Sequence, residues 1–195
     1  MASEQPPTVY ADVRMLFDDV NRFHQAPYRD DPFYALMLQA EFYVPLQHAE
    51  AALKALQPVA GALSGWRSAD EWVGRPEGLE GLVIGTEIRL VKGAGVGCWM
   101  SPFREDSLAI HFSFKHDMAA ALVACRTLQR CLAPFGGRVH WGKLFDAEEF
   151  GTGGTGDGRT RLEMLFPNVN DFRALCQRHD PGGKFRNAYL NTLLF

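Results

Sequence analysis

The chain has 195 residues, of which 47% are hydrophobic and 22% are charged, and its formal net charge at pH 7 is -3. This length suits a single domain with a full hydrophobic core, and the composition excludes an intrinsically disordered chain. Acidic and basic residues are interspersed without a basic stripe, which argues against nucleic acid as a partner.

The cysteines give no sign of a metal site, and the N-terminal residues give no sign of a secretion signal. The four cysteines contain no C-x-x-C pair and have no metal-ligand spacing with histidine, so we expect reduced thiols and no metal site. The start of the sequence lacks a basic segment followed by an apolar one, and no stretch approaches the about 20 apolar residues that span a bilayer. We expect a cytoplasmic chain without a transmembrane segment, peripheral to a membrane at most.

The first elements in chain order are a helix, a loop, a strand and a second helix. Apolar residues at three- and four-residue spacing predict a helix over 10–24, and prolines and aspartates predict a loop over 26–32. Alternating apolar residues predict a strand over 36–44, which Pro45 ends. The alanine- and leucine-rich run that follows predicts a helix over 47–56.

Two long strands are the clearest elements of the sequence. They follow an excursion over 61–81 that is punctuated by glycine and proline. Residues 82–91 and 107–115 both alternate apolar and polar side chains, which is typical of half-buried strands. Each of these strands is therefore predicted to have one polar face.

The remaining elements are mostly helical. In chain order we predict a helix over 117–133 with Asp117 as its N-cap, a short strand over 138–141, a flexible glycine tract over 151–158, and helices over 168–179 and 185–194. Strands and helices do not alternate as regular βαβ units. The predicted fold class is therefore α+β, with a mostly antiparallel sheet and flanking helices.

The polar faces of the two long strands form the first candidate site. Residues two apart on a strand point to the same side about 7 Å apart, so Glu87 neighbours Arg89, and His111 neighbours Ser113. If both strands belong to one sheet with these faces aligned, the four side chains supply the donors and acceptors that adjacent sugar hydroxyls need. The alternative interpretation is a solvated sheet face with an exposed ion pair.

A second candidate is the string His140-Trp141-Gly142-Lys143, which leaves the short strand. A lysine at a strand end can place a positive charge near a developing anion. The alternative is an ordinary solvated lysine. The glycine tract over 151–158 is interpreted as a linker and not as a phosphate-binding loop, because no strand directly precedes it and no lysine follows it as in a P-loop.

Several motifs follow one another in order along the chain: Glu87-Ile88-Arg89, Trp99-Met100-Ser101-Pro102, His111-Phe112-Ser113-Phe114, His140-Trp141-Gly142-Lys143 and the run from Asp180 to Leu190. Together they resemble the C-terminal half of the alditol oxidase and aldonolactone oxidase family. This family includes D-arabinono-1,4-lactone and L-gulonolactone oxidases and belongs to the vanillyl-alcohol oxidase superfamily. The resemblance runs from about Leu38 to the C-terminus.

The resemblance implies roles for the residues of both candidate sites. Members of the family are FAD-dependent two-domain proteins whose C-terminal cap domain lines the substrate pocket over the flavin. By this resemblance Glu87 and Arg89 bind substrate hydroxyls, and His111 and Ser113 lie in the same pocket. Ser113 stands where alditol oxidases tend to have threonine, which retains the hydroxyl. Lys143 is expected close to the reacting hydroxyl and the flavin ring.

The implied reaction is oxidation of a sugar alcohol or an aldonolactone, with oxygen as acceptor and hydrogen peroxide as product. Arg89 and Lys143 are the expected catalytic residues, because their charges can steady the substrate oxygen as its proton leaves. His140, Lys143 and Asn187 are the expected contacts to the cofactor FAD. No residue is identified as the general base.

By the same resemblance, residues 1–195 are expected to be a single cap domain without the family's N-terminal FAD-binding domain. That domain, supplied in cis or in trans, is the expected partner. The excursion over 66–81 and the glycine tract are interpreted as insertions that bear on the shape of the pocket, and hence on the substrate. The alternative is a stand-alone, non-catalytic domain that acts in binding or interaction.

Overall fold

The computed structural model describes residues 37–64, 81–95, 97–151 and 160–195. Residues Leu38–Phe195 form one compact unit. The predicted helix over 10–24, the loop over 26–32, most of the excursion over 61–81 and nearly all of the glycine tract lie outside the described residues.

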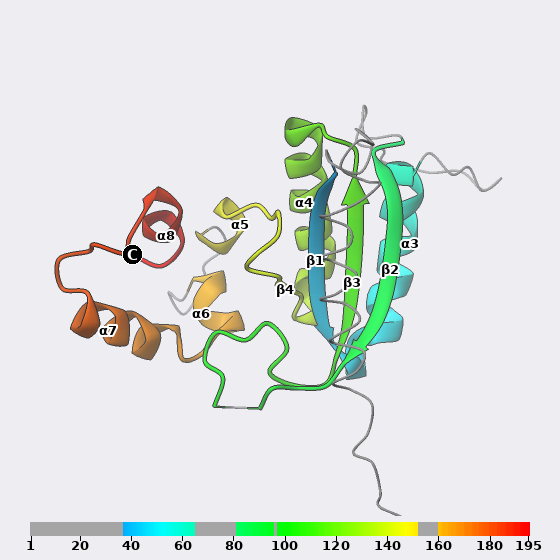
Figure 1. Ribbon diagram of the computed structural model, residues 1–195. Helices are drawn as coiled ribbons and strands as arrows, with labels where there is room; N and C mark the ends of the chain where they lie inside the picture. The colour runs from blue at the N-terminus through cyan, green and yellow to red at the C-terminus, as the bar shows by residue number, and fades with distance from the viewer. Residues whose placement is uncertain (1–36, 65–80, 96, 152–159) are drawn as a thin grey trace, which may run out of the picture. The chain divides into compact units, whose positions relative to one another are not determined.

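The described strands form one four-stranded antiparallel sheet with the order β2-β3-β1-β4 (Figure 1). The strands are β1 (Leu38–Pro45), β2 (Val83–Val91), β3 (Ser107–Phe114) and β4 (Arg138–Val139). This architecture confirms the predicted α+β class with an antiparallel sheet. The two long strands with polar faces, β2 and β3, are direct neighbours.

Helices α3 (Ala49–Ser64) and α4 (Met118–Leu132) pack together and cover one face of the sheet (Figure 1). Asp117 is the N-cap of α4, as predicted, because its carboxylate accepts a hydrogen bond from the backbone N–H of Ala120. The other described helices are η2 (Leu46–His48), η3 (Ala133–Phe135), α5 (Glu148–Gly151), α6 (Arg161–Leu165), α7 (Val169–His179) and α8 (Ala188–Leu193).

The core lies between the sheet and these two helices. Phe42 of β1 and Ile110 and Phe112 of β3 point into it and are about 1% exposed each. Leu128 of α4 packs against them and is fully buried. Burial of each such side chain contributes roughly 1.5–3 kcal/mol. Because side chains alternate along a strand, the residues between these core positions are directed to the opposite face of the sheet.

Helix α3 differs from its prediction at both ends. It begins at Ala49, after the η2 turn, and it continues to Ser64 with Pro58 inside it, whereas the sequence predicted a helix over 47–56. Proline removes one helical hydrogen bond. Val59, directly after the proline, packs against the core, and this tertiary contact favours continuation of the helix.

The prediction that strand β2 is half-buried is wrong at two positions. Ile88 and Leu90 are 54% and 75% exposed. They pair with Ile110 and Leu108 and therefore lie on the core side of the sheet. Because β2 is an edge strand of the described sheet, its side chains have a neighbouring strand on one side only, and apolar alternation alone did not show this.

The last helix begins three residues later than predicted, at Ala188 instead of Phe185. The carboxylate of Asp180 accepts hydrogen bonds from the backbone N–H groups of Lys184 and Phe185, at 2.7 and 2.9 Å. These bonds hold the intervening segment as a turn. Asn187 then caps α8 by accepting from the N–H of Leu190.

The short helices α5 and α6 were not predicted. A signal for α6 is present in the sequence, because Thr160 and Glu163 form a capping box at its first turn. The Thr160 hydroxyl accepts from the Glu163 N–H, and the Glu163 carboxylate accepts from the Thr160 N–H. The helix is too short to show an apolar period.

Candidate functional site

Three strands place ionisable side chains in one row on the sheet face opposite α3 and α4. In the strand register Glu87 of β2 pairs with His111 of β3, and His111 pairs with Glu41 of β1. The condition set by the sequence hypothesis, that both long strands share one sheet with aligned polar faces, is therefore met. The structure adds Glu41, a residue that was not predicted to belong to the site.

Glu41 is the centre of this face. Its carboxylate accepts a hydrogen bond from Arg89 Nη2 at Oε1, at 2.9 Å, and from Lys143 Nζ at Oε2, at 2.5 Å. Arg89 also lies 3.5 Å from Oε2 of Glu87. We call Glu41, Glu87, Arg89, His111 and Lys143 the polar cluster. It unites both candidate sites of the sequence, which were predicted separately.

A small residue allows Arg89 to reach Glu41. Arg89 pairs with Ala109 of β3, one row away from the pair of His111 and Glu41. Its side chain must therefore cross β3 diagonally to reach β1. The methyl group of Ala109 leaves room for this crossing, and Ala109 is fully buried.

The turn after β4 brings Lys143 to the cluster. The N–H of His140 donates to the carbonyl of Glu41, and the N–H of Leu144 donates to the carbonyl of Gln39, so both ends of the turn are bound to β1. The N–H of Lys143 donates to the carbonyl of His140. Lys143 is thus held directly beside Glu41.

Trp141 anchors this turn on its other side. Its indole N–H donates to the carbonyl of Met100 at 2.7 Å, and its ring packs at 4.9 Å from that of Phe166 and 5.8 Å from that of Phe145. An aromatic side chain of this size fixes the backbone around it. The string from His140 to Lys143 is therefore an ordered turn, and its lysine is only 19% exposed.

The charges of the cluster act on its buried carboxylate and imidazole. Burial alone raises the pKa of Glu41, but the hydrogen bond from Lys143 and the charges of Lys143 and Arg89 outweigh it, so this pKa lies below its usual value. Burial, followed by the charge of Lys143, lowers the pKa of His111. At neutral pH the cluster therefore holds an ionised Glu41 and an uncharged His111.

His111 is buried without a hydrogen-bond partner. It is 5% exposed, and neither Nδ1 nor Nε2 has a partner among the described residues. Oε1 of Glu87 is 3.9 Å from Nδ1, which is too far for a hydrogen bond. Buried polar atoms are rarely left unpaired, so the ring retains one donor and one acceptor that no described residue satisfies.

The other predicted site residues lie at different distances from this centre. Ser113 is on the same face and follows His111 by two positions along β3, opposite Gly85 and Gln39. The ring of His140 stacks on that of Tyr43 at 6.2 Å, and its Nδ1 accepts a hydrogen bond from the N–H of Gly142. The side-chain oxygen Oδ1 of Asn187 accepts the capping hydrogen bond from Leu190 N–H and is therefore directed to α8.

The sequence contains a signal that could have identified Glu41. Glu41 is the one charged residue of β1, whose other residues are apolar or aromatic except for Gln39. Carboxylates are almost never fully buried unless they are paired. Glu41 is 5% exposed, and its two cationic partners come from segments 48 and 102 residues away.

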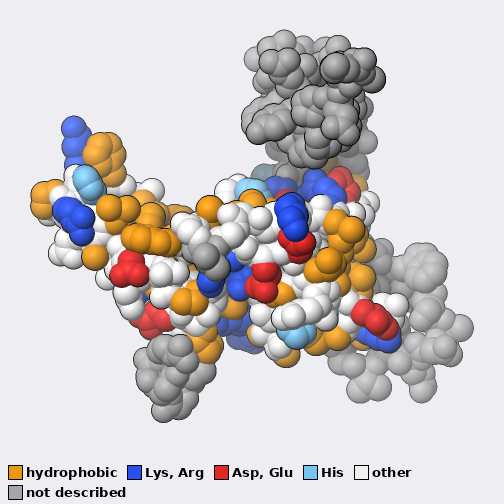
Figure 2. Space-filling view, turned by 90° about the horizontal axis from the view of Figure 1, so that it is seen from below, with side chains coloured by type: hydrophobic (Ala, Val, Ile, Leu, Met, Phe, Trp, Pro, Cys, Tyr) orange, Lys and Arg blue, Asp and Glu red, His pale blue; other side chains and the backbone are white. Residues whose placement is uncertain are grey.

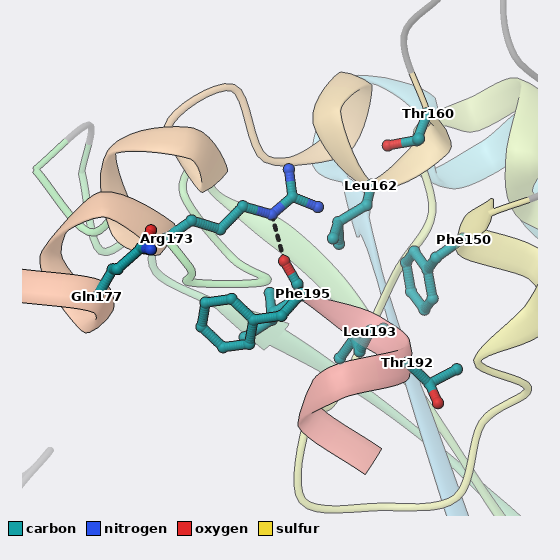
Figure 3. A pocket seen from close by; sticks show the side chains of 9 residues that line it. Phe150, Thr160, Leu162, Arg173, Gln177, Thr192, Leu193 and Phe195 are labelled. Carbon is teal, nitrogen blue, oxygen red and sulfur yellow. Dashed lines mark hydrogen bonds between the residues drawn. The ribbon is translucent and has the colours of Figure 1, made fainter. Parts of the chain in front are cut away.

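A pocket of about 340 Å³ lies elsewhere, among α5, α6, α7 and α8 (Figure 3). Arg173 is its charged lining residue. Two nitrogens of its guanidinium already donate hydrogen bonds within the protein: Nε to the carbonyl of Leu194, and Nη1 to Glu163 and Asn170. Arg173 thus joins three helices, and the polar cluster is the stronger candidate for binding a ligand.

On the face shown in Figure 2, basic and acidic side chains lie next to each other with hydrophobic side chains between them. Phosphate binding favours a continuous area of positive charge, and the described basic side chains do not gather into one on this face. None of the described helices is long and apolar enough to cross a bilayer.

Comparison with known proteins identifies similar sequences. The model of the D-arabinono-1,4-lactone oxidase family matches residues 34–193, a range that contains the whole polar cluster. The alditol oxidase of Streptomyces sp. (strain IKD472 / FERM P-14339) is 31% identical over 159 residues, which are 80% of this chain and 31% of that protein. The chain thus spans less than a third of the length of this relative.

Proposed function

This chain belongs to the D-arabinono-1,4-lactone oxidase family, and we propose that it is the substrate-binding part of an FAD-linked oxidase. The proposed substrates are sugar alcohols or aldonolactones, oxidised at a CH–OH group. Oxygen is the proposed acceptor and hydrogen peroxide the product. The family assignment supports the class of reaction, and the polar cluster supports the class of substrate.

The unpartnered imidazole of His111 carries this proposal. A polyol presents adjacent hydroxyls, each of which donates and accepts hydrogen bonds, and the neutral ring offers one donor and one acceptor. Glu87, 63% exposed, can accept from a hydroxyl, and Arg89, 39% exposed, can donate to one. Ser113, which follows His111 by two positions along β3, extends the same face.

Arg89 and Lys143 are the proposed catalytic residues. Both are cations on the face where the substrate oxygen would lie, and positive charge stabilises that oxygen as its proton departs. Both are oriented through Glu41 before any ligand arrives, at 2.9 and 2.5 Å. Charges that are already oriented need little reorganisation during the reaction.

We propose that the described residues contact only a part of FAD. When bound, FAD supplies the acceptor for the two electrons of the oxidation. Among the predicted cofactor contacts, Lys143 lies on the polar face, whereas Asn187 and Nδ1 of His140 already accept backbone hydrogen bonds. A separate FAD-binding domain, in cis or in trans, is therefore the proposed partner.

The first test is ligand binding without the flavin. The imidazole resonances of His111 are followed by NMR while xylitol, or D-arabinono-1,4-lactone, is added to millimolar concentrations. We expect them to shift in the wild-type chain and in the control Lys54→Ala, which alters an exposed pair with Glu50. We expect no shift in Arg89→Ala. Unchanged His111 resonances in the wild-type chain would contradict the proposed substrate class.

A visible absorption spectrum recorded after addition of FAD tests the oxidase. Bound flavin that loses its absorbance on addition of a polyol indicates catalysis by this chain. Polyol binding without flavin reduction, even when a flavin domain of the family is added, would instead favour the non-catalytic binding domain.

A further inference from the structure

We infer that Glu41 is a positioning residue that holds Arg89 and Lys143 as two oriented cations for the ligand of the polar cluster. This inference rests on the proposed function for the identity of that ligand. It assigns Glu41 and Glu87 different tasks, although both are carboxylates beside the same arginine. Glu41 orients the cations, and Glu87 is left to contact the ligand.

The two cations come from independent segments. Arg89 belongs to the edge strand β2, and Lys143 belongs to the turn that follows β4 at the other side of the sheet. Each occupies a different oxygen of Glu41. Two like charges this close repel each other, and the carboxylate between them makes their approach favourable. Without the carboxylate of Glu41, the side chains of Arg89 and Lys143 would be free to adopt other rotamers.

Glu41 is well suited to this task because its own position is set by the sheet. It lies in the inner strand β1, paired with His111 on one side, and its carbonyl accepts from His140 on the other. The carboxylate is 6% exposed, against 63% for that of Glu87. A buried carboxylate on a fixed strand orients its partners, whereas an exposed one remains able to accept from a ligand.

The test begins with a measurement that needs no ligand. The full chain is labelled with an amine-reactive acylating reagent, and the rate at each lysine is read by mass spectrometry. We expect Lys143 to react about tenfold faster in Glu41→Gln than in the wild-type chain, because a charge-assisted hydrogen bond is lost. In the control Glu50→Gln, the exposed partner Lys54 should change by less than about twofold.

The second measurement is the dissociation constant for the same polyol. We expect it to rise about tenfold or more in Glu41→Gln while Glu50→Gln matches the wild-type chain. If Glu41→Gln does not fold, Glu41→Asp takes its place in the test. This variant keeps the charge but is one methylene shorter, so Lys143 should react faster than in the wild-type chain, but by less than the about tenfold expected for Glu41→Gln.

The outcomes separate the two hypotheses. An unchanged labelling rate at Lys143 in a folded Glu41 variant overturns the inference. Faster labelling together with unchanged polyol affinity overturns it as well, because the cations would then be released without consequence for the ligand. If the wild-type chain binds no polyol, the proposed function fails, and the labelling rates still decide whether Glu41 holds Lys143.

Discussion

Nζ of Lys143 lies 2.5 Å from Oε2 of Glu41, although the two residues are 102 positions apart in the chain. Their side chains are 19% and 6% exposed, so water screens the pair only weakly. Removal of Lys143 would take from this buried carboxylate one of its two cationic partners, and only Arg89 would then compensate its charge.

Lys143→Met should therefore lower the free energy of unfolding by about 2 kcal/mol, the loss of one charge-assisted hydrogen bond, because Arg89 still pairs with Glu41. The double variant Glu41→Gln/Lys143→Met should lose less than the sum of the two single variants, because each single variant already removes the interaction between these two side chains. Urea unfolding of the wild-type chain and the three variants measures this coupling. Strictly additive losses would show that the two side chains do not interact in solution.

Stability should fall as the pH drops below 6.5, the usual pKa of histidine. Burial, followed by the charge of Lys143, lowers the pKa of folded His111, so the unfolded chain takes up a proton first. The contribution of His111 to the free energy of unfolding is fully present above pH 6.5 and is lost as the pH falls towards its folded-state pKa. Urea unfolding midpoints recorded from about pH 5 to about pH 8, on both sides of the usual histidine pKa of about 6.5, measure this loss of stability.

His111→Gln should flatten this pH dependence. His140 has a pKa lowered in the same direction, again mainly by burial. His140→Gln therefore removes a second part of the slope, and the double variant should be flatter than either single one. A wild-type slope that persists unchanged in His111→Gln would assign the effect to other groups.

Gly137→Ala should lower the free energy of unfolding by about 2 kcal/mol through overpacking. An added Cβ would lie 2.6 Å from Cβ of Leu132 and 2.9 Å from its carbonyl oxygen, and Leu132 is fully buried. Gly182→Ala is the matched control, because nothing lies within 4 Å of a Cβ there. Equal thermal stability of the two variants would refute the steric argument.

Asp117→Ala should destabilise α4 by about 1 kcal/mol, because the N–H of Ala120 loses its capping acceptor. Asp117→Asn retains an acceptor, so its free energy of unfolding should differ from that of the wild-type chain by about 0.3 kcal/mol or less. Thermal unfolding monitored by circular dichroism distinguishes the two variants. A loss of the same size in both would mean that the charge of Asp117, and not its cap, matters.

Local patterns were sufficient for much of the fold. Alternation identified β2 and β3 within one residue at each end, and the N-cap at Asp117 marked the start of α4. These features depend on neighbours a few residues apart, which sequence periodicity reports directly. By contrast, α3 continues through Pro58 because of its packing on the core, which no local pattern encodes.

The candidate site divides in the same way. Period two placed Glu87 beside Arg89 and His111 beside Ser113, because residues two apart on a strand necessarily share a face. Strand order decided the rest. Only the antiparallel pairing of β1 with β3 puts Glu41 next to His111, and only the turn after β4 brings Lys143 to the second oxygen of that carboxylate. Contacts between segments this distant depend on the global register of the sheet, which is set by the burial of the whole core rather than by any single stretch of sequence.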